Sequence, residues 1–224
     1  MSDAVAIIPA RGGSKGIPHK NIIEFCNKPL LVHSIEQALG CPRITNTYVS
    51  SDSKKILKVA EDSGALPIER PPEIAGDTAS SECALIHAIG SIKKKPKVIV
   101  FLQPTSPLRT SAHIDNALQK FIDDGADSLF SAVDAGDVCL WESTVSPRSI
   151  TYDYRERKRR QEFPPYIVEN GSIYITKTDM LLETKNRLCG KISHYLMDKW
   201  SIHEVDAPED VALCEVLTRE FLFQ

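Results

Sequence analysis

The sequence contains no apolar run that approaches the roughly 18 residues needed to cross a bilayer. Its first residues, MSDAVAIIPARGG, lack the charged region and the long apolar stretch of a secretory signal. The six cysteines are scattered without a C-x-x-C pair, which argues against a zinc site and for free thiols in a reducing compartment. These absences predict a cytoplasmic protein without a membrane partner.

An excess of positive charge is also missing, because 27 lysines and arginines stand against 30 aspartates and glutamates, a net charge of −3. Such a chain has no global field that attracts nucleic acid, so any anion must be bound by local charge. The basic run RERKRRQEF at 155–163 includes two glutamates and is typical of a solvated face. We therefore expect no nucleic-acid partner, although one of these arginines could reach an anionic substrate or a partner subunit.

What the chain does contain is an alternation of strand-like and helix-like segments. Apolar runs indicate strands at 4–10, 45–52, 66–70, 97–105, 128–134, 171–177 and 203–206. Helical spacing, serine caps and terminal glycines indicate helices at 30–39, 53–65, 80–92, 111–125, 179–185 and 208–222. This order predicts a single domain, residues 1–224, with a Rossmann-like, mostly parallel α/β sheet and helices on both faces. Residues 135–169 break the alternation and are predicted to form a small inserted excursion.

The opening loop IIPARGGSKGIPHKN, at 7–21, fits neither G-x-x-x-x-G-K-[ST] nor G-x-G-x-x-G. It still combines three glycines with three cations: Gly12, Gly13, Gly16, Arg11, Lys15 and Lys20. Glycines let backbone N–H groups approach an oxyanion, and the cations add charge that suits phosphate. On composition alone, a phosphate cradle and a glycine turn with solvated charges remain equally good interpretations.

Two further loops place polar side chains where predicted strands end, which is where ligands bind in parallel sheets. In ERPPEIAGDTASS (69–81), an arginine follows a strand and two serines precede a helix. In FLQPTSPLRT (101–110), two prolines stiffen a loop that is rich in hydrogen-bonding groups. Taken alone, the first fits a surface loop with a helix cap, and the second can also be a rigid turn with a helix cap.

Acidic residues gather in HEVDAPED, at 203–210. Glu204 and Asp206 are two residues apart, so on a strand their side chains face the same side. Paired carboxylates beside a phosphate site predict Mg²⁺ (or Mn²⁺), since such hard cations take one or two carboxylates plus phosphate oxygens. Glu209 and Asp210 instead fit the first turn of the last helix.

Five stretches together resemble the acylneuraminate cytidylyltransferase family, which comprises the CMP-sialic acid synthetases and their relatives acting on other nine-carbon sugar acids. They are IPARGGSKGIPHKN (8–21), RPPEIAGDTASS (70–81), QPTSPLR (103–109), RRQEFPPYIVENGSIYI (159–175) and VDAPED (205–210). The resemblance covers most of the chain. It implies an enzyme in which the anomeric hydroxyl of a 2-keto sugar acid attacks the α-phosphorus of CTP, so that a CMP-sugar forms and pyrophosphate leaves.

The resemblance also implies roles for individual residues. Arg11, Lys20 and Asp206 would be catalytic, with Lys20 stabilising the charge of the α-phosphoryl group and Asp206 binding the metal. The implied nucleotide-binding residues are Arg11, Gly12, Gly13, Lys15, Asn21, Arg70, Ser80 and Ser81. The implied sugar-binding residues are Gln103, Thr105, Arg160, Asn170 and Tyr174. The excursion at 135–169 would be a dimerisation element, which implies a homodimer.

Three departures from the family pattern bear on the sugar or its metal. Glu204 stands where the metal motif usually has a first aspartate, and NRLCGK (186–191) stands where sialic-acid-specific members carry a Phe-Phe pair. A lysine that the family contributes across the dimer has no counterpart in DVCLWES (137–143). The sugar therefore stays open among N-acetylneuraminate, legionaminate and related nonulosonates.

Three other interpretations compete with this one. A CMP-Kdo synthetase shares the opening and cytidine loops but fits the NG-x-IY stretch less well. A nucleotide-sugar-binding protein without catalysis is kept open by Glu204. A nucleic-acid-binding protein would use the run at 155–163, but the net charge of −3 opposes it.

Overall fold

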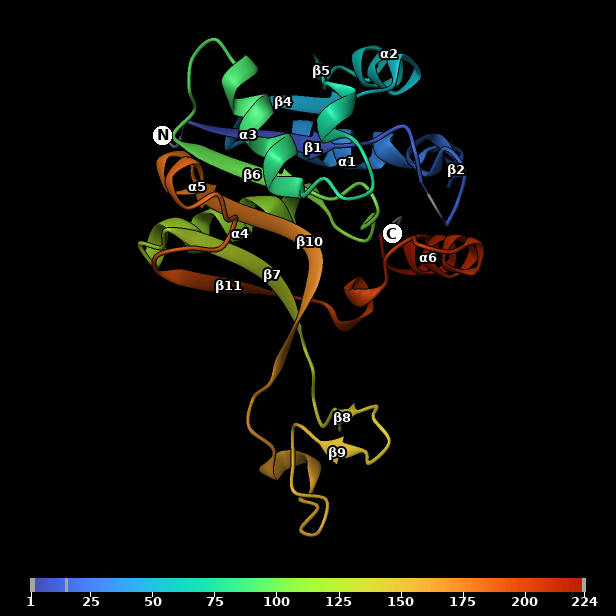
Figure 1. Cartoon of the computed structure of the whole chain (residues 1–224), viewed down its shortest axis with the longest axis vertical. Coiled ribbons are helices and arrows are strands. Elements are labelled where there is room, and N and C mark those ends of the chain that lie inside the picture. Colours follow the sequence, from blue (N-terminus) through green and yellow to red (C-terminus); the bar gives the residue numbers. More distant parts are fainter. Residues whose placement is uncertain (1–2, 15, 223–224) are drawn as a thin grey trace.

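The computed structural model describes residues 3–14 and 16–222, apart from the side chain of Arg160. Within these residues seven strands form one sheet: β1 (Ala4–Pro9), β4 (Ile44–Ser51), β5 (Leu66–Glu69), β6 (Val98–Leu102), β7 (Ser128–Asp134), β10 (Ile167–Lys177) and β11 (Ile192–Met197). Their order is β11-β7-β10-β6-β1-β4-β5 (Figure 1). In the described chain the neighbours are parallel except around β10, which is antiparallel to both β6 and β7.

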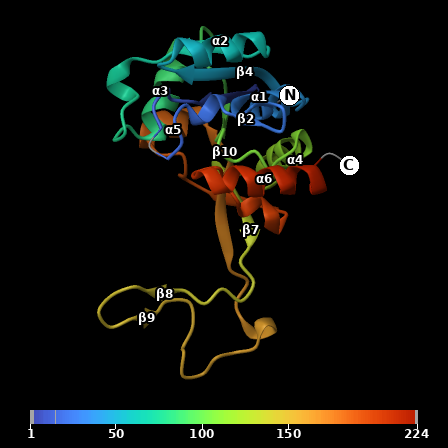
Figure 2. The ribbon, with the colours of Figure 1, turned by 90° about the vertical axis from the view of Figure 1, so that its right-hand side faces the viewer.

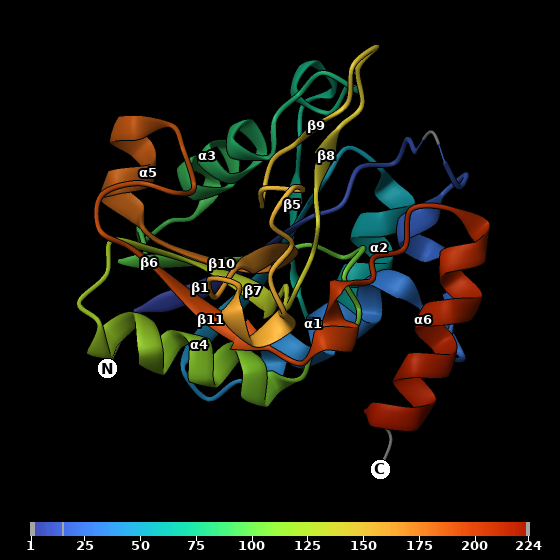
Figure 3. The same ribbon diagram turned by 90° about the horizontal axis from the view of Figure 1, so that it is seen from below.

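Helices cover both faces of this sheet, as the view from below shows (Figure 3). One face carries α1 (Leu30–Leu39), α2 (Lys54–Asp62) and α4 (Ser111–Asp123), and the other carries α3 (Ser81–Ser91) and α5 (Thr178–Thr184). This division follows from the alternation of side chains along β1. Its even-numbered residues pack in the apolar cluster with α1, α2 and α4, and its odd-numbered residues pack in the cluster with α3 and α5. The predicted fold class is confirmed. None of the helices in the described ranges is both long and apolar enough to cross a membrane.

A third apolar cluster lies beside the sheet and fixes the C-terminal helix α6 (Pro208–Phe221). It joins α6 to a small hairpin of β2 (Glu24–Phe25) and β3 (Lys28–Pro29), and it includes the fully buried Val205. Because Val205 is held in this cluster, the acidic segment before α6 lies next to the opening loop.

Three details of the chain differ from the sequence-based expectation. The strand predicted at 203–206 is wrong: this segment has no ladder partner, and Val205 N–H donates instead to the carbonyl of Thr105 at 2.8 Å. The strand β11 forms one edge of the sheet beside β7, and it was missed because its side chains are mostly half-buried or exposed and give no apolar run. Strand β10 begins at Ile167, inside the range assigned to the excursion, and a bulge interrupts its pairing between Glu169 and Tyr174.

Residues 135–166, which we call the arm, project away from the sheet between β7 and β10 (Figures 1 and 2). The arm contains a minimal ladder of β8 (Trp141–Glu142) and β9 (Arg148–Ser149) and a ring cluster around Trp141. Several large apolar side chains of the arm are exposed, among them Val145 and Ile150. The arm falls within the range 135–169 predicted for the excursion, and its part in dimerisation stays a prediction.

Candidate functional site

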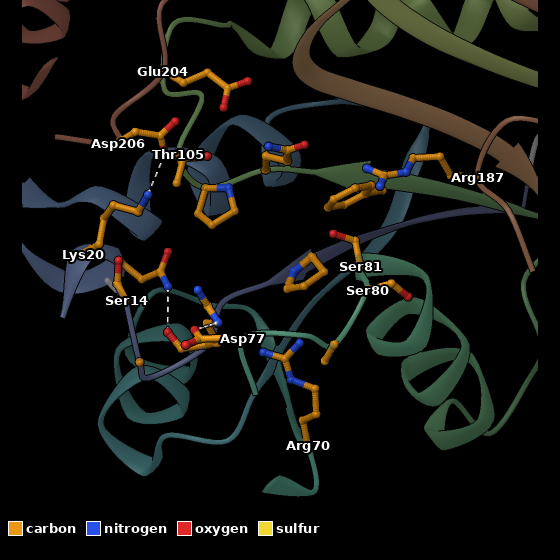
Figure 4. A pocket seen from close by; sticks show the side chains of 18 residues that line it. Ser14, Lys20, Arg70, Asp77, Ser80, Ser81, Thr105, Arg187, Glu204 and Asp206 are labelled. Atoms are coloured by element: carbon orange, nitrogen blue, oxygen red, sulfur yellow. Dashed lines mark hydrogen bonds and ion pairs between the residues drawn. The ribbon is translucent and has the colours of Figure 1, made fainter. Parts of the chain in front are cut away.

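A cavity of about 500 Å³ lies at the carboxyl ends of β1, β5 and β6 (Figure 4). Its walls come from the four loops that carry the predicted site residues, at 9–21, 70–81, 101–105 and 204–206. A fifth contribution, Arg187, comes from the segment between α5 and β11 and was not predicted as a site residue. The parallel strands explain the gathering, because their carboxyl ends meet at one edge of the sheet.

Two hydrogen bonds between side chains and the backbone of the opening loop hold this loop in place. Gly12 N–H donates to Asp52 Oδ1 at 2.8 Å, and Asn21 Nδ2 donates to the carbonyl of Arg11 at 2.9 Å. A Cβ on Gly12 would lie 2.9 Å from that of Ser53, so this glycine permits close packing rather than lining the cavity. Gly13 does line the cavity, and no described atom would lie within 4 Å of a Cβ built there. Of the two adjacent glycines, only Gly13 therefore offers open backbone to a ligand.

The predicted catalytic cation, Lys20, forms an ion pair with Asp206, Nζ to Oδ1, at 2.8 Å. Lys20 begins a short 3-10 turn, Lys20–Ile22, and His19 before it has φ 55°, in the left-handed region. The loop returns so close to the acidic segment that a Cβ on Gly16 would lie 2.3 Å from the carbonyl oxygen of Asp206. Lys15, also predicted to bind phosphate, lies outside the described residues.

Arg11, the second predicted phosphate cation, is paired with a residue that was not predicted as part of the site. Its Nη1 lies 2.6 Å from Asp77 Oδ1, and both side chains line the cavity. Asp77 belongs to the loop before α3, 66 residues away in the chain. No local pattern connects two residues so far apart, so nothing in the sequence signals this pair.

The predicted cytidine-binding residues line one side of the cavity. Arg70 follows β5 and is buried, yet its Nε and Nη2 have no hydrogen-bond partner among the described residues. Burial lowers the pKa of its guanidinium, while Asp52 opposes the shift. Ser80 caps α3 by accepting from Cys83 N–H at 3.2 Å, and Ser81 begins the helix. Buried donors without acceptors are rare in proteins, so the geometry of Arg70 points to a ligand with acceptor atoms.

The loop after β6 carries Gln103 and Thr105 into the cavity, and it is fixed from behind by the fully buried Arg109. The Arg109 guanidinium donates to the carbonyls of Gln103 at 3.0 Å and Ser106 at 2.6 Å, and also to the hydroxyl of Ser34. Burial lowers the pKa of Arg109 to about 9, and Glu204 opposes the shift. This arginine was not predicted as a support, because it lies in the wall and not in the cavity.

Glu204 and Asp206 both line the cavity, although no strand joins them. Burial raises the pKa of Glu204, and the neighbouring Asp206 raises it further. Asp210 accepts from the N–H groups of Asp206 and Ala207, at 2.9 and 2.7 Å, and so orders the turn into α6. No cluster of three or more histidine, cysteine, aspartate or glutamate side chains suited to a metal occurs among the described residues. Two carboxylates still fit Mg²⁺, which typically takes one or two of them and completes its shell with phosphate oxygens and water.

Two of the predicted sugar-binding residues, Asn170 and Tyr174, do not line the cavity. Asn170 is buried, and its amide group is bonded to Ser131 and Ser201, so it supports the bulge of β10. Tyr174 is buried against Phe101, with its hydroxyl bonded to Glu169. Arg160 lies in the arm, and its side chain is outside the described part.

A model of the family described as Cytidylyltransferase matches residues 5–197. The chain belongs to this family. The matched range contains the seven-stranded sheet of the described residues except Ala4, the first residue of β1. Among the described residues that line the cavity, it omits Glu204 and Asp206. Membership in the cytidylyltransferase family confirms the resemblance drawn from the motifs.

Individual cytidylyltransferases show what this chain is similar to. It is 30% identical over 211 residues to an N-acylneuraminate cytidylyltransferase of Streptococcus agalactiae, a match that covers 92% of this chain and 51% of that protein. The chain thus spans about half the length of such curated relatives. It is 29% identical over 220 residues to a pseudaminic acid cytidylyltransferase of Campylobacter jejuni, a match that covers 95% of each.

A solved structure of CMP:2-keto-3-deoxy-manno-octonic acid synthetase complexed with CTP shares the fold, with a TM-score of 0.75 and 18% identity. The likeness covers 99% of this chain and 100% of that one. At this identity the similarity concerns the fold alone.

Proposed function

We propose that this protein joins CTP to a nine-carbon 2-keto sugar acid, giving the CMP-sugar and pyrophosphate. The observation that carries the proposal is the buried Arg70 guanidinium, whose Nε and Nη2 lack an acceptor among the described residues of the cavity wall. Figure 4 shows Arg70 apart from Lys20 and Asp206, so one cavity offers both a donor site for a base and a charged site for phosphates.

Cytosine fits the donor site because its O2 and N3 both accept hydrogen bonds. Uracil presents an N–H at position 3, which would face the Arg70 guanidinium as donor against donor. A site built on donors rejects such an analogue strongly, because a buried polar group then stays unpaired. Ser80 and Ser81, at the start of α3, add hydroxyl groups to the same wall.

The phosphate chain would lie along Arg11, Gly13 and Lys20, which also line the cavity. Lys20 would stabilise the negative charge that grows on the α-phosphoryl group as the anomeric hydroxyl of the sugar attacks in line. One preorganised donor of this kind typically contributes about 100- to 1,000-fold to kcat. Pyrophosphate leaves on the side opposite the attacking hydroxyl, so Arg11 would balance charge on the leaving group.

Asp206 and Glu204 would hold a Mg²⁺ or Mn²⁺ ion in this pocket. When bound, the ion would supply charge neutralisation and orientation of the phosphate oxygens. Gln103 and Thr105 would contact the sugar acid, since both line the cavity. The similarity to relatives named for N-acylneuraminate and for pseudaminic acid supports nonulosonic acids as the class, with legionaminate among the sugars to test.

The arm supports a homodimer. No described residue of the arm lines the cavity, and its exposed apolar side chains suit a protein partner better than water. A second copy would cover them and bring its arm to the neighbouring site. All six cysteines lie in the described ranges and are free, which, with CTP as a substrate, supports a cytoplasmic location.

The experiment is pyrophosphate release from CTP with Mg²⁺ and a panel of nonulosonic acids, with UTP and Kdo as comparisons. We expect release with nonulosonic acids and CTP only. Lys20→Ala should lower kcat about 100-fold or more, while Lys28→Ala, whose lysine pairs with Glu36 outside the cavity, should leave it unchanged. Release with Kdo alone, or none with any acid, would overturn the proposal.

The homodimer has its own measurement. Light scattering at micromolar concentration should give twice the mass of the chain. A fully active monomer would contradict the role proposed for the arm.

A further inference from the structure

Arg187 is the cavity residue that the motifs left without a role. It lies in the segment between α5 and β11, where the sequence departs from the pattern of sialic-acid-specific relatives. The role inferred for Arg187 rests on the proposed function and concerns the feature of the sugar acid that this arginine would recognise.

The Arg187 guanidinium is held rigidly before any ligand binds. Its centre lies 5.3 Å from the ring centroid of Phe101 and 4.9 Å from that of Tyr174, and the two rings are stacked on each other at 5.4 Å. Its Nε lies 2.6 Å from an oxygen of Glu82, near the start of α3. A side chain fixed on one face and at one nitrogen loses little further freedom when it binds a ligand.

The remaining hydrogen-bonding capacity of Arg187 is at its two terminal Nη groups. The one hydrogen bond of the Arg187 side chain to the described residues uses Nε, so the Nη groups are left to a ligand in the cavity that the side chain lines. The charge of the guanidinium is balanced by Glu82, whose side chain is 16% exposed. Because the Glu82 carboxylate already balances the charge of the Arg187 guanidinium, its Nη groups suit an uncharged acceptor, such as an amide carbonyl, better than a second carboxylate.

The position of Arg187 indicates which part of the substrate it would meet. Figure 4 shows it on the opposite side of the cavity from Lys20, Glu204 and Asp206. The reacting anomeric carbon must lie near Lys20, so the substituents at the far end of the sugar are the ones that extend toward Arg187. In nonulosonic acids those substituents include acylamino groups, whereas deaminated and eight-carbon acids carry hydroxyl groups there.

We propose that Arg187 determines specificity by donating from its Nη groups to the carbonyl of an acylamino substituent on the sugar acid. Phe101 and Tyr174 support the guanidinium from behind, and Glu82 both orients it and cancels its charge. Tyr174 thus influences the sugar end without lining the cavity itself.

The test compares one acylamino sugar acid that the wild type uses with its counterpart that carries a hydroxyl at the same carbon. Arg187→Met keeps a long side chain over the rings but removes the donors. We expect kcat/KM for the acylamino acid to fall about 10- to 100-fold, with little change for the hydroxyl acid and an unchanged KM for CTP. Arg219→Met, which removes an ion-paired arginine from α6, is the matched control and should leave both acids unaffected.

An equal loss on both acids, or a raised KM for CTP, would overturn the assignment of Arg187 to the acylamino group. Glu82→Ala is the second variant, needed if Arg187→Met melts at a lower temperature than wild type. It releases the guanidinium, so we expect several-fold weaker discrimination between the two acids; undiminished discrimination in this folded variant would also overturn the inference. A wild type that turns over both acids equally refutes this inference alone, whereas one that turns over no nonulosonic acid refutes the proposed function.

Discussion

Replacing Gly171 by alanine tests how the fold makes room for Glu204. Gly171 lies in the bulge of β10 with φ +67°, a conformation that side chains disfavour. A Cβ built there would lie 1.9 Å from Glu204 Oε1, 3.0 Å from its Cδ and 3.4 Å from Gln103 Nε2. The glycine is therefore the space into which the Glu204 carboxyl group fits.

Two effects of Gly171→Ala can be separated by their size and by what they alter. The left-handed backbone costs an alanine about 1–2 kcal/mol, which lowers Tm by about 2–8 °C in a chain of this length. The clash itself is with the end of a flexible side chain, so it is relieved when Glu204 rotates away. We therefore expect the steric effect to appear as lost activity, about 10-fold or more, because the displaced carboxylate no longer faces the phosphates.

Thermal melting and pyrophosphate release measure the two effects, with Gly125→Ala as the matched control. Gly125 has φ +57°, and no described atom would lie within 4 Å of its Cβ, so this variant carries the backbone cost alone. In a Glu204→Ala background, Gly171→Ala should lower Tm as before but reduce activity no further. An additive loss of activity in the double variant, or wild-type activity in Gly171→Ala, would refute the reasoning.

Three further changes have defined outcomes. Gly13→Ala meets open space, so Tm should stay within about 1 °C while KM for CTP rises if phosphate approaches this backbone; an unchanged KM would remove Gly13 from the cradle. Asp77→Asn frees Arg11 from a partly exposed ion pair worth about 1 kcal/mol at most, so KM for CTP should fall up to about 5-fold, and a rise would show that Asp77 assists binding. Asp210→Ala should cost about 1 kcal/mol at neutral pH, measured by urea unfolding, because its carboxylate accepts from the N–H groups that open α6. These bonds hold the pKa of Asp210 below its usual range, so the contribution is complete above the unfolded-state pKa of about 4 and disappears as pH falls through the folded-state value; a difference that persists in acid would contradict this cause.

The sheet and the gathering of loops at its carboxyl edge were predictable because they depend on local patterns. Strands β1 and β6 are buried on both faces and read as continuous apolar runs, and glycine or serine marks the ends of several helices. Once the sheet is parallel, its topology brings the loop ends together without further information. Hence the four loop segments line one cavity, as their places after predicted strands indicate.

Other parts of the site depend on contacts between residues far apart, which no local pattern records. The Arg187–Glu82 pair spans 105 residues, and each side chain alone is an ordinary surface charge in the sequence. Asn170 was assigned to the sugar through the NG motif, but the bulge of β10 turns its amide inward to Ser131 and Ser201. The sequence shows that a polar residue is present, but the register of a bulge decides which side it faces.

The ion pair of Lys20 with Asp206 has a consequence for how ligands enter the pocket together. An anion that takes Lys20 leaves Asp206 open to a cation, and a cation on Asp206 leaves Lys20 open to an anion. Linkage requires that each ligand then raises the affinity for the other by the same factor. Asp206 is 70% exposed, so breaking the pair costs about 1 kcal/mol at most, and the factor is about five. A lone anion or a lone cation must break this pair to bind, whereas a ligand that carries both charges exchanges it for two contacts of its own.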